Sequence, residues 1–137
     1  METTDLLRKL IRACVDDERT LRHESTFVDA PRAETLTRLA HERGQFVSAL
    51  ERLGQHDEPH DGSWTELSRE AGRDLRVTMG GRNSTDAITA CRHSRARTEA
   101  AYDEALKASW PGEIVRVLTS QRGCLRDETG ELDELQF

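Results

Sequence analysis

The chain has 137 residues, the usual size of one domain with a single hydrophobic core. Apolar residues make up 35% and charged residues 34%, as expected when each helix gives one apolar stripe to the interior, and an aromatic share of 4% disfavours a β-sandwich or barrel. The net charge of −6 comes from interspersed acidic and basic residues, so binding to nucleic acid or to anionic lipid is not expected.

Two long amphipathic helices are predicted in the first part of the chain, over residues 5–28 and 32–53. In each, apolar residues recur at the three- and four-residue spacing of one helix face. Pro31 suits the first turn of the second helix, and Gly54 suits the left-handed position just after its end. Because few residues join these helices, we expect them to pack as an antiparallel hairpin.

A shorter helix is predicted over residues 64–79, where Ser63 and Glu66 match a capping box. Two more helices are predicted over residues 84–108 and 112–134, and they form a second hairpin.

The connection between the two hairpins, roughly 28 residues long, can cross the length of a bundle at about 1.5 Å per helical residue. The chain is therefore expected to be one all-α domain over residues 1–137. Its expected fold is a four-helix bundle of two antiparallel helical hairpins, joined by a long crossover that contains the shorter fifth helix. Simple antiparallel packing of five helices is the alternative.

The cellular location is predicted from two features of the sequence. No apolar run approaches the roughly 20 residues that span a bilayer, and Met1–Thr4 leads into a charged amphipathic segment rather than a signal peptide. We therefore expect a cytoplasmic protein without a membrane partner. The three cysteines are widely spaced and form no Cys-x-x-Cys pair, so we expect them to act as small core residues.

Three stretches of sequence resemble a known family: LAHERGQF over residues 39–46, TMGG over 78–81 and TEAAYDEAL over 98–106. They are similar to a bacterial ferritin-like four-helix-bundle family of unknown function, distantly similar to ferritin and rubrerythrin. The likeness covers nearly the whole chain in order and length. For the wider group it implies a ferritin-like bundle with a dinuclear iron or manganese site. That site takes one Glu from each of two helices and a Glu-x-x-His from each of the other two.

Candidate metal ligands follow from this resemblance, because carboxylate oxygens bridge two cations and imidazole completes each coordination sphere. Glu18 lies in the apolar stripe of the first helix, so we expect it to point inward near the middle of the bundle. In the Glu-x-x-His pattern, His stands three residues after Glu. Here Gln45 stands three residues after Glu42, and Glu131 stands three residues after Glu128. The candidate ligand set is Glu18, Glu42, Gln45, Glu99 and Glu128.

A structural interpretation of the same residues competes with the metal site. An inward Glu18 can pair with Arg43 or Arg95 in a buried ion-pair layer that sets helix register. The expected polar core partners are Arg43, Arg95, Gln121 and Tyr102. A third alternative is that these side chains reach solvent from the stripe edges. The loop with His56 and His60 is interpreted as a surface connector rather than a zinc or nickel site.

No phosphate loop, nucleophile elbow or Cys/His pair is visible, so no catalytic residue is assigned. We expect a non-catalytic bundle without a cofactor that acts as an interaction or stress-associated protein, as a homodimer or with an unknown protein partner. The alternative is a carboxylate-bridged di-iron or di-manganese protein that works as an oxidase or a metal store. A further alternative is a partner-binding module that presents the helix around Trp64.

Overall fold

The structure is a computed structural model that describes residues 3–57 and 83–135. Within these ranges the regular secondary structure is entirely helical, so the all-α prediction is confirmed there. The predicted helix over residues 64–79 and His60 lie outside the described residues, and the side chain of His56 lies outside them as well. The elements are α1 (Thr3–Glu24), the short 3-10 helix η1 (Ser25–Phe27), α2 (Ala30–Asp57), α4 (Ser84–Ala105) and α5 (Gly112–Glu134).

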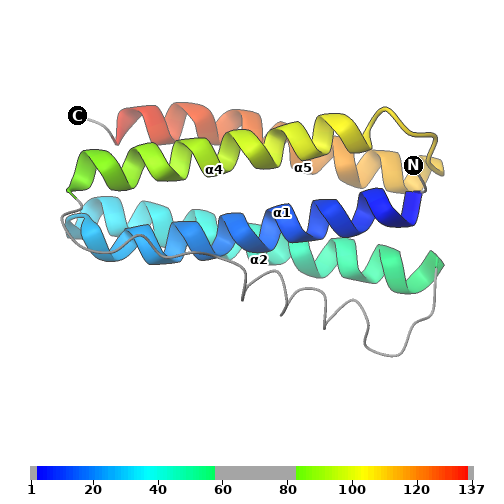
Figure 1. The fold of residues 1–137 in the computed structure, drawn as a ribbon, viewed down its shortest axis with the longest axis horizontal. Helices are drawn as coiled ribbons and strands as arrows, with labels where there is room; N and C mark the ends of the chain where they lie inside the picture. Colours follow the sequence, from blue (N-terminus) through cyan, green and yellow to red (C-terminus); the bar gives the residue numbers. More distant parts are fainter. Residues whose placement is uncertain (1–2, 58–82, 136–137) are drawn as a thin grey trace.

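The four long helices form a bundle (Figure 1). Neighbouring helices run antiparallel in three pairs: α1 with α2, α1 with α4, and α4 with α5 (Figure 1). As a result α2 and α4 run in the same direction. Helix α1 packs along both α2 and α4, and α4 also packs along α5. Helix α1 therefore buries a broad face, because it contacts two neighbours.

The first hairpin turns earlier than predicted. Helix α1 ends at Glu24 rather than at residue 28. The hydroxyl of Ser25 donates to the Arg22 carbonyl at 2.6 Å, and that of Thr26 donates to the His23 carbonyl at 2.7 Å. These bonds satisfy carbonyls of the last helical turn, which have no partner further along the helix. Helix α1 therefore ends where side-chain hydroxyls donate to its last carbonyls in place of backbone N–H groups.

The end of α2 also differs from the prediction. The helix continues through Gly54 to Asp57, so the predicted stop at Gly54 is wrong. A glycine inside a helix costs about 1 kcal/mol relative to alanine. Gly54 is buried in the bundle, and packing at this position outweighs that cost.

The second hairpin has well-defined ends. The side chain of Asn83 accepts a hydrogen bond from the Asp86 backbone N–H at 2.8 Å, so Asn83 caps α4. Helix α4 ends at Ala105, three residues before the predicted position. The Trp110 indole N–H donates to the Ala105 carbonyl at 2.7 Å and fixes the turn that leads to Pro111 and α5.

The apolar core consists of two separate clusters. The first lies toward the start of α1 and the turn between α4 and α5, and it includes Leu7, Leu10, Ile11, Cys14, Val15, Val47, Leu50, Tyr102, Ala105, Ile114, Leu118 and Leu125. The second lies toward the opposite end and includes Leu21, Leu36, Leu39, Ala40, Ile88, Cys91 and Leu132. Buried polar side chains lie between the two clusters.

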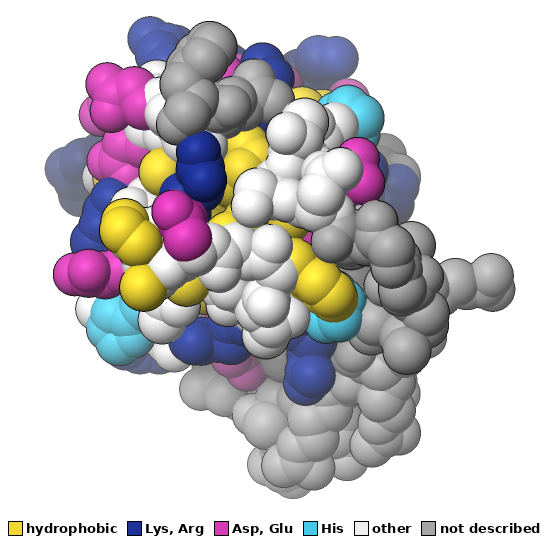
Figure 2. Space-filling model, turned by 90° about the vertical axis from the view of Figure 1, so that its left-hand side faces the viewer, with side chains coloured by type: hydrophobic (Ala, Val, Ile, Leu, Met, Phe, Trp, Pro, Cys, Tyr) yellow, Lys and Arg dark blue, Asp and Glu magenta, His cyan; other side chains and the backbone are white. Residues whose placement is uncertain are grey.

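The outer surface is charged. Figure 2 shows the end of the bundle where α1 ends and α2 begins, with acidic and basic side chains interspersed around apolar atoms. None of the helices in the described ranges is long and apolar enough to span a membrane.

Candidate functional site

A buried polar layer crosses the waist of the bundle and takes one side chain from each long helix. We call it the waist layer, and it consists of Asp17, Arg43, Ser94 and Glu128. Arg43 Nε donates to Asp17 Oδ2 at 2.6 Å, and Arg43 Nη2 donates to Glu128 Oε1. Ser94 Oγ donates to the other Asp17 oxygen, Oδ1, at 2.6 Å. The Arg43 and Asp17 residues are both 0% exposed, so these bonds form away from solvent.

Helical spacing explains why these four side chains meet. On α1, Asp17 lies three residues after Cys14 and four before Leu21, both of which are buried. Arg43 and Glu128 each lie at the same kind of spacing from buried neighbours on α2 and α5. Residues at this spacing share one helix face, so the inward stripe of each helix carries one polar side chain at the same height.

Arg43 is the cation of the waist layer. Burial alone would lower its pKa, but Asp17 and Glu128 outweigh that effect, and the pKa is raised above its ordinary value. The guanidinium carbon also lies 5.0 Å from the centre of the Phe46 ring, in cation–π range. The guanidinium therefore stays charged, and its charge faces the two carboxylates.

Glu128 is the more weakly satisfied acid. Burial raises the pKa of its carboxyl, Arg43 opposes that shift, and Asp17 adds to it. Glu128 Oε2 and Arg43 Nη1 are buried and have no hydrogen-bond partner among the described residues. Leaving a buried polar atom without a bond costs about 1–3 kcal/mol. The waist layer is therefore held together by charge and is incompletely bonded.

A second group of polar side chains lies next to the waist layer, toward the first core cluster. The Tyr102 hydroxyl donates to Gln121 Oε1, and Cys14 Sγ lies 3.4 Å from the same hydroxyl oxygen. Because the phenol has one proton, and it goes to Gln121, the Cys14 thiol is the donor to Tyr102. Burial raises the pKa of Cys14 to about 12 and holds the pKa of Tyr102 well above its ordinary value. Both groups are therefore neutral near pH 7, and the thiol is a poor nucleophile.

The structure places Glu18 differently from the prediction. Asp17 occupies the inward position, whereas the Glu18 side chain is 26% exposed and pairs with Arg22 at 3.1 Å. Its carboxylate lies against α2, where a Cβ added to Gly44 would be 3.4 Å from Glu18 Oε1. The expected inward orientation of Glu18 is wrong, because α1 faces both α2 and α4 and its buried face is centred one residue earlier.

Three of the other candidate ligands lie outside the waist layer. Glu42 pairs with Arg38 on the surface at 3.5 Å, and Gln45 is exposed. Glu99 bonds to Arg95 on its own helix and to Arg122 of α5 at 2.9 Å. Of the five candidates, Glu128 alone belongs to the waist layer.

The expected polar core partners are found in three places. Arg43 lies in the waist layer, whereas Gln121 and Tyr102 lie in the neighbouring group of polar side chains. Arg95 lies at the edge of the core, where it bonds to Glu99 and to the Leu125 carbonyl.

The residues of the waist layer do not fit a dinuclear metal site. A guanidinium supplies the positive charge between Asp17 and Glu128, in the place where a cation would lie. Within residues 3–57 and 83–135, no group of three or more His, Cys, Asp or Glu side chains is arranged to hold a metal ion. The donor set is two carboxylates, and both are already engaged with Arg43.

Sequence reasoning did not identify Asp17, Ser94 or Cys14 as members of this polar region. The segment Asp16-Asp17-Glu18 offers three consecutive acids, so a small error in helix phase selects the wrong one. The spacing Leu10, Cys14, Asp17, Leu21 was a signal that could have found Asp17. Ser94 and Cys14 carry no sequence signal beyond a small side chain on an inner face.

Comparisons with models of protein families, with curated proteins and with solved structures found no match for this chain.

We predict that Arg43→Met lowers the free energy of unfolding by about 3–5 kcal/mol, because it leaves Asp17 and Glu128 buried without a counter-charge. Urea denaturation followed by circular dichroism measures this loss. The matched control is Arg116→Met at an exposed position of α5, expected to change stability by less than about 0.5 kcal/mol. Equal effects of the two substitutions would contradict the assignment of Arg43 as the cation of the layer.

We predict that Glu128 makes the protein less stable as the pH rises from about its ordinary pKa of 4.5 through its raised folded-state pKa. In that range the folded state holds a proton that the unfolded state has released, so raising the pH favours unfolding. Glu128→Gln removes this titration, and its stability relative to the parent protein is expected to increase over the same range. Denaturation at a series of pH values measures the difference, with Glu134→Gln at an exposed position as the control. Parallel curves for the parent and Glu128→Gln would refute the prediction.

Proposed function

We propose that this chain is a non-catalytic helical bundle of ferritin-like arrangement that acts as an interaction protein, and that its waist layer serves to hold the helices in register. The observation that carries this proposal is the position of Arg43 between Asp17 and Glu128. The arginine provides the positive charge that a metal would bring in a ferritin-like centre, so the acids of the layer need no metal for charge balance.

The register role follows from the cost of misplacing these side chains. A shift of one helix by a single turn would move Arg43 or Asp17 into an apolar cluster, since such clusters lie on both sides of the layer. An unpaired buried charge costs several kcal/mol, whereas a paired one contributes little net stability. The waist layer therefore disfavours shifted packings more than it stabilises the correct one.

The parallel course of α2 and α4 supports the ferritin-like arrangement (Figure 1). A chain that leaves α2 at one end and enters α4 at the other needs a connection that crosses the bundle, as in the ferritin-like group. Simple up-and-down order of four helices would instead make α2 and α4 antiparallel.

We predict that replacing the charged residues of the waist layer by apolar residues keeps the bundle stable but no longer selects one helix register. In the triple variant Asp17→Leu, Arg43→Met, Glu128→Leu, the helical circular dichroism and the free energy of unfolding are expected to be kept or increased. The amide spectrum in 1H–15N NMR is expected to show broadened or doubled peaks, because the helices lose the polar contacts that select one packing. A single sharp set of peaks would contradict a register role.

We further predict that the protein, purified without an affinity tag and loaded anaerobically with ferrous iron or manganese, retains no stoichiometric metal in its core after desalting. Elemental analysis measures the ratio, and oxygen uptake after iron loading is expected to equal that of the iron alone. The control is the Asp17→Asn variant, which should give the same result. Binding of about two ions per chain that Asp17→Asn or Glu128→Gln abolishes would favour the di-metal alternative over the proposal.

A further inference from the structure

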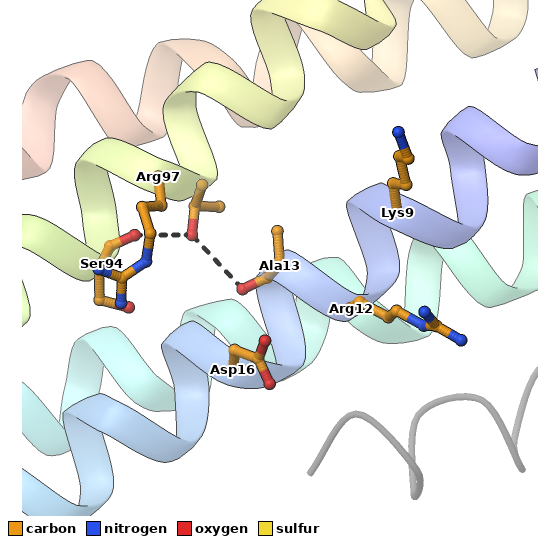
Figure 3. Close-up of a pocket in the computed structure, with 7 residues that line it drawn as sticks. Lys9, Arg12, Ala13, Asp16, Ser94 and Arg97 are labelled. Atoms are coloured by element: carbon orange, nitrogen blue, oxygen red, sulfur yellow. Dashed lines mark hydrogen bonds between the residues drawn. The ribbon is translucent and has the colours of Figure 1, made fainter. Parts of the chain in front are cut away.

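A groove of about 280 Å³ lies between α1 and α4 and has Ser94 of the waist layer in its lining (Figure 3). Lys9 and Arg12 extend from α1, and Arg97 extends from α4. Small side chains make up the floor, among them Ala13 of α1 and Thr98 of α4. Arg97 lies beside Ser94 at one end of this floor, and Lys9 and Arg12 extend from α1 toward the other end (Figure 3).

The floor is closed by direct contacts between the two helices. The Thr98 hydroxyl donates to the Ala13 carbonyl at 3.4 Å and to the Ser94 carbonyl at 3.0 Å. Ser94 lines the groove and donates its own hydroxyl proton to Asp17 of the waist layer. Both hydroxyl protons are therefore committed to protein acceptors, and the charged rim is left to recognise a ligand.

The rim is positively charged, although the chain as a whole is not. Among the described residues, Lys9, Arg12 and Arg97 line the groove together with one acid, Asp16, so these four side chains carry a summed charge of +2 in a chain of net charge −6. All three cations are exposed, and none makes a hydrogen bond or ion pair within the described ranges. Other arginines of the bundle, such as Arg22 and Arg122, face an acid on their own or a neighbouring helix.

We propose that this groove binds a small organic or inorganic oxyanion, whose phosphate or carboxylate group is held by Arg97 while the two cations of α1 attract the anion from the other end of the groove. Guanidinium groups match both kinds of oxyanion with two parallel hydrogen bonds. The apolar floor at Ala13 and Thr98 accommodates the uncharged part of the ligand. A volume near 280 Å³ is at the small end of the range for small-molecule sites, which favours a small ligand over a macromolecule.

Binding in the groove is expected to reach the core through one residue. Ser94 lies in the groove wall and also bonds to Asp17, which bonds to Arg43. A ligand that orders the rim would also restrict the Ser94 side chain, so the amides near the waist layer should respond to it. This binding site does not depend on the register role proposed above, because its cations are outside the waist layer.

The test is titration of the 15N-labelled protein with sodium phosphate and, separately, with sodium hexanoate, with ionic strength held constant by sodium chloride. Saturable shifts are expected at the amides of Ala13, Ser94, Arg97 and Thr98, and the melting temperature is expected to rise with ligand concentration. Saturation by phosphate alone, or by hexanoate alone, identifies the group that the groove prefers. Shifts that stay linear with both anions would overturn the proposal and leave an adventitious ion only.

Variants separate this site from general attraction of anions. Arg97→Gln and the double variant Lys9→Gln, Arg12→Gln are each expected to weaken binding by at least about tenfold, the loss expected when a charged hydrogen bond is removed. Arg116→Gln, at an exposed position of α5, is the matched control and should bind as the parent protein does. All these positions are exposed, so circular dichroism should show unchanged folding. Unchanged affinity in Arg97→Gln would refute the site.

Discussion

The guanidinium of Arg43 is buried at the waist of the bundle and bonds to carboxylates from two other helices. The rest of the structure depends on this contact, because a charge with no exposed surface must be matched where it lies. Asp17 of α1 and Glu128 of α5 supply the negative charges that pair with Arg43. Ser94 of α4 donates a further hydrogen bond to Asp17. The four helices are thus tied at one height by polar contacts that a shifted helix cannot make.

The apolar core is divided by this polar layer. Leucines dominate the clusters on both sides, and leucine packing by itself tolerates several registers. A polar layer between two apolar clusters removes that ambiguity, since its charges have one position of low energy.

The waist layer contains more acidic than basic side chains, and this surplus affects the pKa of Glu128. Burial and the neighbouring Asp17 hold the Glu128 pKa above its ordinary value, against the opposing effect of Arg43.

The α1–α4 seam combines a structural and a surface role. Small residues allow the two helices to approach closely, and the Thr98 hydroxyl joins them through the Ala13 carbonyl. The same small residues leave the groove that carries Lys9, Arg12 and Arg97 on its rim. The small side chains of Ala13 and Thr98 therefore account both for the direct hydrogen bond between α1 and α4 and for the open groove beside it.

Local sequence determined most of the helical architecture. Apolar spacing located the four described helices, and Pro31 marked the first turn of α2 through a backbone effect that needs no tertiary contact. The stops were less accurate at Gly54 and after Glu24, because burial and side-chain bonding to free carbonyls depend on neighbouring helices. The sequence also indicated a polar core layer that includes Arg43.

The tertiary structure alone decided which acid enters that layer. Successive residues of a helix differ by about 100° in direction, so Asp17 and Glu18 point to different neighbours although both lie near the apolar stripe. A stripe read from one helix does not show that α1 packs against α2 and α4 together, and this double contact turns Asp17 inward and leaves Glu18 against Gly44. The meeting of Arg43 with Glu128 spans 85 positions of sequence, and only the packing of whole helices brings two such residues together.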